Sequence, residues 1–152
     1  MCINPNCSQP DHPDNANKIL CQSCGCELIL HGRYHVIRLL SDDSGFSNVY
    51  EAYAEKTPKI LKILKQERNE EPKEVELFEQ ERYVLEKLNH PGIPKVDDYF
   101  QFMTENGQLL HCLVMEKIEG FNLVQWLKHQ GNQPISQKQA LVWLKQLAEI
   151  LH

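Results

Sequence analysis

The stretch Lys59-Ile60-Leu61-Lys62-Ile63-Leu64-Lys65 predicts the fold of the chain more clearly than any other segment. Its pattern is typical of a β-strand, in which successive side chains point to opposite faces of a sheet. Lys62 then shares one face with Ile60 and Leu64, and the other face is apolar as well. We therefore expect both faces to be covered. The Lys62 amine needs an anionic partner there, unless its stem packs along the surface and the amine reaches water.

The segment 73–88 supplies a candidate partner, because its apolar residues recur at helical spacing. These residues form one stripe and are Leu77, Phe78, Val84, Leu85 and Leu88. Glu81 falls near the centre of the stripe, where a carboxylate that faces the core requires a cation. We infer an ion pair between Lys62 and Glu81. The alternative is that Glu81 reaches the edge of the packed surface and is solvated.

The composition of the 152-residue chain is that of a soluble globular protein, with 41% hydrophobic and 24% charged residues. This length suffices for one ordinary domain, or for a small module and part of another. No run of about 18 apolar residues is present, and the N-terminus lacks the features of a secretory signal. We therefore expect a cytoplasmic protein without membrane contacts. The formal net charge of −5 gives no electrostatic support for nucleic-acid binding.

Five of the six cysteines lie in residues 1–31. Four of them form two pairs with short spacings, Cys2 with Cys7 and Cys21 with Cys24. The spacer between the pairs is mostly Pro, Asn, Asp and Ser, which cannot build a hydrophobic core. Because cytosolic thiols stay reduced, this spacing favours a zinc ion held by four thiolates in a zinc-ribbon-like module.

Other interpretations of residues 1–31 remain open. The segment could be a disordered tail with adventitious thiols, or a redox Cys-x-x-Cys motif, although no βαβ pattern surrounds it. Cys26 could compete with Cys24 as a ligand. The segment has Lys18 as its one fixed positive charge and no aromatic residue for base stacking. A structural or protein-contacting role is therefore favoured over nucleic-acid binding.

The remaining sequence predicts an α+β fold with a five-stranded antiparallel sheet and one packed helix. The expected strands are 34–40, 46–54, 59–65, 96–102 and 109–115. The expected helices are 73–88, 121–130 and 136–151, with a polar turn at 41–45 and a charged loop at 66–71. Asn106-Gly107 is the strongest turn signal. One side of the last helix is apolar and consists of Leu141, Leu144, Leu147, Ala148 and Leu151.

Three strands, a helix with an inward glutamate, two strands and a connector resemble the N-terminal lobe of a protein kinase. Lys62 and Glu81 match the phosphate-binding lysine of that family and the glutamate that orients it. The run 90–94, His-Pro-Gly-Ile-Pro, resembles the turn after the family's helix, and 113–116, Leu-Val-Met-Glu, resembles the run into its hinge. The cysteine prefix followed by Arg33-Tyr34 is similar to that of cyanobacterial serine/threonine kinases with a four-cysteine prefix.

The resemblance implies a domain order and a nucleotide site. Residues 1–31 would be the zinc-binding module, 34–120 the kinase N-lobe and hinge, and 121–152 the start of the C-lobe. Lys62, oriented by Glu81, would hold the α- and β-phosphates of ATP with Mg²⁺. The backbone of Glu116 and Ile118 would meet the adenine. The implied site residues are Leu40, Val49, Ile60, Lys62, Glu81, Met115 (the gatekeeper), Glu116 and Ile118.

The sequence departs from the family pattern in the glycine-rich loop and at the adenine roof. Asp42, Ser44 and Ser47 stand in the three glycine positions, and Gly45 is one place off. Side chains there obstruct the approach of backbone amides to phosphate, and Asp42 would repel it. Ile60 stands where the family usually has alanine. We therefore expect ATP binding to be weak or absent.

A larger departure is that the sequence contains no His-Arg-Asp, no catalytic-loop asparagine and no Asp-Phe-Gly. It ends within the helix that precedes the catalytic loop, so we expect no phosphoryl transfer by this chain alone. The leading hypothesis is a zinc-prefixed serine/threonine kinase N-lobe. The alternative is a non-catalytic, zinc-binding interaction protein of pseudokinase type. We expect a protein partner, either a substrate or the missing C-lobe, and self-association through residues 121–151.

Overall fold

A computed structural model describes residues 1–43 and 45–151, apart from the side chain of Leu151, and divides the chain into two compact units. The first unit consists of Met1–Leu88 and Pro94–Lys117, and the second of Asn89–Ile93 and the segment from Ile118 onward. The predicted glycine-loop position Ser44 and the predicted apolar position Leu151 therefore lie outside what can be described.

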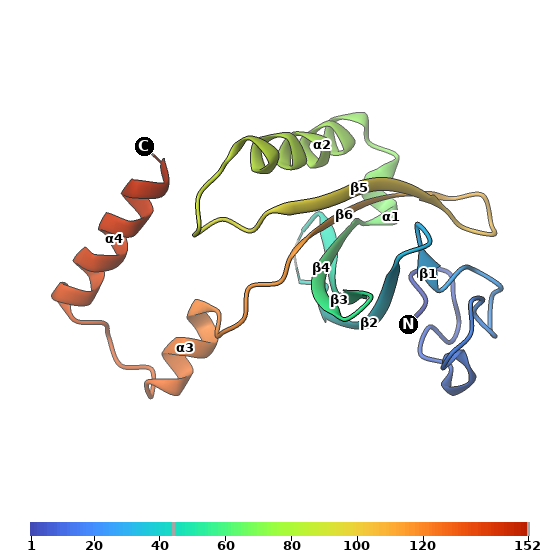
Figure 1. Cartoon of the computed structure of the whole chain (residues 1–152), viewed down its shortest axis with the longest axis horizontal. Helices are drawn as coiled ribbons and strands as arrows, with labels where there is room; N and C mark the ends of the chain where they lie inside the picture. The colour runs from blue at the N-terminus through green and yellow to red at the C-terminus, as the bar shows by residue number, and fades with distance from the viewer. Residues whose placement is uncertain (44, 152) are drawn as a thin grey trace. The chain divides into compact units, whose positions relative to one another are not determined.

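The first unit is built on an antiparallel sheet of six strands in the order β1-β2-β3-β4-β6-β5 (Figure 1). The strands are β1 (Ile29–Leu30), β2 (Tyr34–Ser41), β3 (Ser47–Ala54), β4 (Thr57–Leu64), β5 (Val96–Met103) and β6 (Leu109–Glu116). The predicted α+β fold with an antiparallel sheet is confirmed, but the predicted count of five strands was wrong. The additional strand, β1, is only two residues long and pairs with the start of β2 across a turn at His31 and Gly32. A pair this short leaves no periodicity in the sequence.

Strand β4 lies in the middle of the sheet and is covered on both faces, as its sequence predicted. Leu61 and Ile63 belong to a large apolar cluster that also contains Tyr34, Tyr50 and residues of β6. On the opposite face, Leu64 packs with Phe78, Leu113 and Met115, and Ile60 is partly buried against this second cluster. Lys62 lies between Ile60 and Leu64 on the second face.

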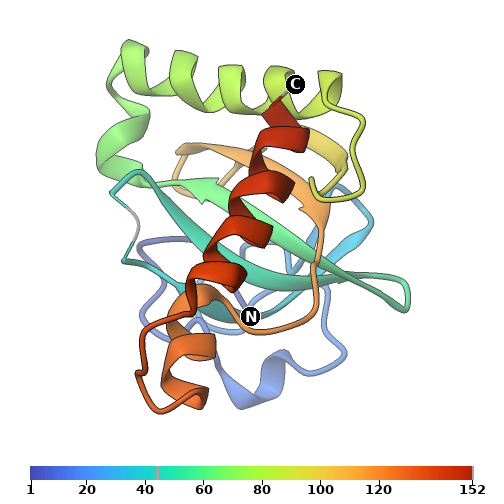
Figure 2. The same ribbon diagram turned by 90° about the vertical axis from the view of Figure 1, so that its left-hand side faces the viewer.

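The second apolar cluster is closed by α2 (Pro72–Lys87), which lies along the sheet in both views (Figures 1 and 2). Pro72 occupies the first turn, where its missing N–H leaves no hydrogen bond unmade, and Glu74 complements the helix dipole. Phe78 is buried, but Leu77, Val84 and Leu88 are exposed. The predicted apolar stripe is therefore only partly covered within the first unit.

Residues 66–71 were expected to form a loop, but Gln66–Asn69 form a short helix, α1. Arg68 of α1 forms an ion pair with Glu74 of α2 at 2.8 Å. The Asn69 side chain donates a hydrogen bond to the backbone carbonyl of Leu109 in β6. Such tertiary contacts stabilise a four-residue helix that has no apolar periodicity to reveal it in the sequence.

The second unit contains α3 (Leu123–His129) and α4 (Gln137–Leu151), close to the two predicted helices. Asn122 and Gln125 form a capping box at the start of α3, which satisfies two backbone amides. Trp126 of α3 and Trp143 of α4 meet edge to face with ring centroids 5.0 Å apart. Across residues 1–43 and 45–151, no helix has the length and apolar character needed to cross a bilayer.

Candidate functional site

The inferred ion pair between β4 and α2 is confirmed. Lys62 Nζ donates to both carboxylate oxygens of Glu81, at 2.6 Å to Oε1 and 2.7 Å to Oε2. The side chains are 21% and 38% exposed, respectively, so water reaches the pair. The bidentate contact nevertheless fixes the amine on the α2 side of the sheet.

Breaking this ion pair should cost stability. Removal of one partner of a fully buried pair costs about 3–5 kcal/mol, and the exposure of Glu81 reduces our expectation to about 1–2 kcal/mol. Urea unfolding of Lys62→Met, Glu81→Gln and the double variant would measure this cost and the coupling energy. Fully additive single effects would contradict an energetically significant pair.

A cavity of about 200 Å³ lies beside the ion pair. Its lining comes from the start of β3, from β4 and from α2, and consists of Phe46, Ser47, Lys62, Leu64, Glu74, Leu77, Phe78 and Glu81. A phosphate group that entered here would meet the Lys62 ammonium, but also the carboxylates of Glu74 and Glu81. This charge balance suits a phosphate that arrives with a divalent cation.

Five of the residues proposed for the adenine roof and hinge lie in the first unit, and four of these belong to β3, β4 and β6. Val49 is the cross-strand partner of Lys62, and Ile60 is the partner of Met115. Directly paired residues of antiparallel strands project to the same face. Glu116 pairs with Lys59, and its backbone N–H donates to the carbonyl of Lys95 at 2.9 Å. Val49, Ile60 and Met115 therefore share the face on which Lys62 meets α2.

Leu40, also proposed for the roof, lies at a register irregularity of β2 between the pairs Leu39–Tyr50 and Ser41–Val49. Ile118 belongs to the second unit, whereas the other proposed site residues belong to the first. The site described here is therefore built from β2, β3, β4, α2 and β6.

Two of the three residues in the glycine positions of the loop, Asp42 and Ser47, can be described. Asp42 is exposed, and its carbonyl accepts a hydrogen bond from Lys65 Nζ at 2.7 Å. Ser47 is buried at the start of β3. Neither Asp42 nor Ser47 has the open backbone that a glycine would give a phosphate.

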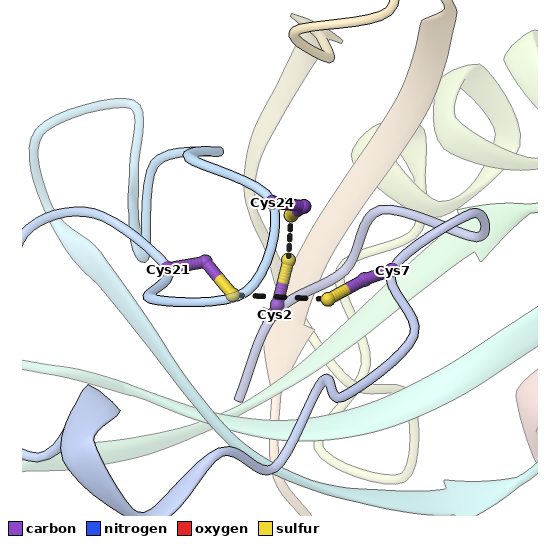
Figure 3. Close-up of side chains that lie close together, drawn as sticks. All are labelled: Cys2, Cys7, Cys21 and Cys24. Carbon is purple, nitrogen blue, oxygen red and sulfur yellow. Dashed lines mark hydrogen bonds between the residues drawn. The ribbon is translucent and has the colours of Figure 1, made fainter.

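The structure brings the four predicted thiol ligands together at one point (Figure 3). The sulfur atoms of Cys2, Cys7, Cys21 and Cys24 all lie within 4.8 Å of one another. The Cys2–Cys24 and Cys7–Cys21 sulfur pairs are 3.5 and 3.7 Å apart. Zinc–sulfur bonds of about 2.3 Å in a tetrahedron imply sulfur–sulfur distances of about 3.8 Å. The donor set therefore fits zinc in both chemistry and spacing.

Cys2, Cys7 and Cys21 differ in how readily their thiols ionise. Burial opposes ionisation of Cys21, but backbone N–H groups of Cys24 and Ser23 lower the pKa of its thiol to about 6. Burial raises the pKa of Cys2 and of Cys7. These backbone contacts favour the thiolate form of Cys21, which is the form that binds a metal ion.

Cys26 does not belong to this cluster, so the structure favours Cys24 over Cys26 as the fourth ligand. Its buried sulfur accepts hydrogen bonds from Asn4 Nδ2 at 3.3 Å and from the backbone N–H of Glu105 at 3.4 Å. Glu105 lies in the turn between β5 and β6. Cys26 thus links the cysteine segment to the sheet, a role that could not be predicted because Glu105 is distant in the sequence.

Two further ion pairs near the candidate site were not predicted. Lys59 of β4 meets Asp97 of β5 at 2.6 Å. Glu51 of β3 meets Lys117 after β6 at 3.0 Å. A carboxylate within the mainly apolar run of β3 is a signal that could have prompted a search for cations, but its partner lies far away in the sequence.

A profile of the protein tyrosine and serine/threonine kinase family matches residues 39–152, which include Lys62, Glu81 and the connector after β6. The chain belongs to the protein kinase family. Serine/threonine-protein kinase B of Synechocystis is 36% identical to it, over 86% of this chain and 23% of the relative. Serine/threonine-protein kinase F of the same organism is 30% identical over 99% of this chain and 35% of the relative. The resemblance to cyanobacterial serine/threonine kinases is thereby confirmed.

Solved kinase structures agree with the fold. The crystal structure of the Mycobacterium tuberculosis PknI kinase domain superposes with a TM-score of 0.60 at 21% identity. The match covers 78% of this chain and 46% of that domain, and at this identity it speaks for the fold alone. This kinase chain spans 23% of the length of kinase B and 35% of the length of kinase F, so the match does not extend to a whole kinase.

Proposed function

We propose that the chain is the N-terminal part of a serine/threonine protein kinase and supplies one half of an ATP site. The observation that carries this proposal is the Lys62–Glu81 ion pair, at 2.6 Å, in a chain of the kinase family. In this family a lysine held by such a glutamate binds the α- and β-phosphates of ATP. Lys62 would do so here, with Mg²⁺ offsetting the carboxylates that line the cavity.

The other proposed site residues would bind the base. Val49, Ile60 and Leu40 would cover the adenine, Met115 would close the rear of its pocket, and the backbone of Glu116 and Ile118 would hydrogen-bond to it. Cys2, Cys7, Cys21 and Cys24 would hold one zinc ion, which supplies a structural crosslink and no redox chemistry. We propose that the 152 residues bind nucleotide weakly, because Asp42, Ser44 and Ser47 stand in the glycine positions and Ile60 stands at the adenine roof. They contain no His-Arg-Asp or Asp-Phe-Gly, so we propose that they transfer no phosphate alone.

Calorimetric titration with Mg-ATP, together with a radiolabel transfer assay, tests the two parts of this proposal separately. We expect binding weaker than micromolar and no transfer of label to a protein acceptor. Micromolar affinity would contradict the weak-binding part. Label transfer that is lost in Lys62→Ala would contradict the inactivity of the isolated chain.

Restoring a glycine in the phosphate-facing loop should strengthen nucleotide binding. Asp42→Gly removes a negative charge and frees the backbone to approach phosphate, so we expect several-fold tighter binding of Mg-ATP. Asp42→Asn removes only the charge and separates the two causes. If both variants bind Mg-ATP like the original chain, the loop does not limit affinity.

A second candidate function, a non-catalytic interaction protein, is favoured by one observation. Leu141, Leu144 and Leu147 on α4 are all exposed within the described residues. An apolar helix face of this kind promotes association. We expect the 152-residue chain to self-associate through residues 121–151, or to leave this stretch poorly protected from hydrogen exchange.

Light scattering combined with hydrogen exchange tests this expectation. Leu144→Glu should shift the chain toward monomer, whereas Gln146→Glu, an equal charge change at an exposed polar position of α4, should not. A strictly monomeric original chain with strong exchange protection across residues 121–151 would contradict it.

A further inference from the structure

Glu51 is a buried carboxylate in a part of the sheet that the proposed nucleotide site would use. Its side chain is 8% exposed and is the cross-strand neighbour of Ile60, on the face that carries Val49 and Lys62. A carboxylate in this position requires cations around it, because an unpaired buried charge is strongly unfavourable.

Two cations meet Glu51 from different elements. Arg38 Nε of β2 donates to Oε2 at 2.7 Å, and Lys117 Nζ lies 3.0 Å from Oε1. Hydrogen bonds from Arg38 and Lys117 lower the pKa of the Glu51 carboxyl, so it is ionised at neutral pH. The two contacts differ in their surroundings, since the Arg38 side chain is 65% exposed and that of Lys117 is 18% exposed.

Lys117 directly follows β6 and ends the chain segment of the first unit. Its neighbour Glu116 is held from the other direction, because its N–H donates to the carbonyl of Lys95 and its carboxylate accepts from the N–H of Lys95 at 3.1 Å. The connector at residues 116–117 is thus attached on one side to the start of β5 and on the other to β3. Side-chain contacts on both sides restrict where its backbone groups can lie.

We propose that Glu51 is a positioning residue for nucleotide binding, which fixes the 116–117 connector through its ion pair with Lys117. This inference rests on the proposed ATP site and adds the residue that sets the place of its base-binding backbone. Glu51 acts on the adenine end of the site, whereas Lys62 acts on the phosphate end. The two ends can therefore be probed separately.

The test uses heteronuclear NMR to monitor two separate titrations of the full 152-residue chain, one with adenosine and one with Mg-tripolyphosphate. Glu51→Gln should weaken adenosine binding several-fold and leave tripolyphosphate binding unchanged. Lys117→Gln should have the same effect, and the double variant should be no worse than either single one. Arg38→Gln, which removes the other cation from the same carboxylate, should leave adenosine binding unchanged.

Three results would overturn the proposal. The first is unchanged adenosine affinity in Glu51→Gln. The second is an effect of Glu51→Gln that Lys117→Gln does not reproduce, since the carboxylate would then act on the ligand or the sheet directly. The third is an equal loss of adenosine and tripolyphosphate binding in Glu51→Gln, because a positioning role at the adenine end would spare the phosphate end.

Thermal unfolding of each variant shows whether such an equal loss comes from general unfolding. Glu51→Asp keeps the charge, so it should recover part of the adenosine affinity that Glu51→Gln loses.

If the original chain binds neither probe, the proposed ATP site itself fails. Amide hydrogen exchange of residues 115–117 still tests the connector, since it needs no ligand. Exchange there should be faster in Glu51→Gln and Lys117→Gln than in the original chain and in Arg38→Gln. Equal exchange in all four proteins would overturn the positioning role on its own.

Discussion

Replacing Cys21 with serine is expected to reduce bound zinc from one ion per chain to nearly none. Cys21 is one of the four thiols of the cluster, and backbone N–H groups favour its ionised form, so its loss removes a donor that is suited to bind a metal. Metal analysis of protein purified without a metal-binding tag measures the change. Cys26→Ser is the matched control, because Cys26 lies in the same segment but outside the cluster, and it should retain zinc.

Loss of zinc should also lower the thermal stability of the first unit. Ile3 packs in the main apolar cluster of the sheet, next to Cys2, so the cysteine segment and the sheet share a core. Metal binding to the folded state is therefore linked to folding of the whole unit, and zinc affinity should fall as acid protonates the thiolates. An original chain that holds almost no zinc while residues 1–31 stay folded would rule out the metal site.

Replacing Lys62 with methionine is expected to weaken binding of Mg-AMP-PNP by about tenfold or more, since loss of one charge-assisted contact to phosphate is worth roughly 1.5–3 kcal/mol. The methionine keeps the length of the apolar stem and removes only the amine. Calorimetry at matched concentrations compares the two proteins. Lys56→Met, an equal charge change in the exposed turn after β3, should bind like the original chain. Similar losses in both variants would mean that net charge alone, and not the position of Lys62, governs binding.

The Lys62–Glu81 pair could be predicted because its signals are local. One charge interrupts an otherwise apolar strand, and the other interrupts an apolar helical stripe, so each residue is short of a partner in its own segment. The paired spacing of Cys2, Cys7, Cys21 and Cys24 is local in the same sense. The structure places all four sulfurs together, as this spacing indicated.

Features that depend on tertiary contacts could not be predicted in this way. Strand β1 and helix α1 are too short to show a period, and they are held by β2, α2 and β6. The Glu51–Lys117 contact depends on where the end of β6 lies relative to β3, which no local pattern encodes. The helical stripe of residues 73–88 overstated burial, because a period shows which residues share a face and not how much of that face is covered.

The central claim is that the Lys62 face of the sheet is half of a nucleotide site, and a heteronuclear NMR titration of the 152-residue chain with Mg-AMP-PNP tests it most directly. We expect chemical-shift changes concentrated in residues 40–49, at Ile60, Lys62 and Glu81, and in residues 115–118, with the cysteine segment unaffected. Saturable shifts located elsewhere, or no shifts at any soluble concentration of the nucleotide, would contradict it.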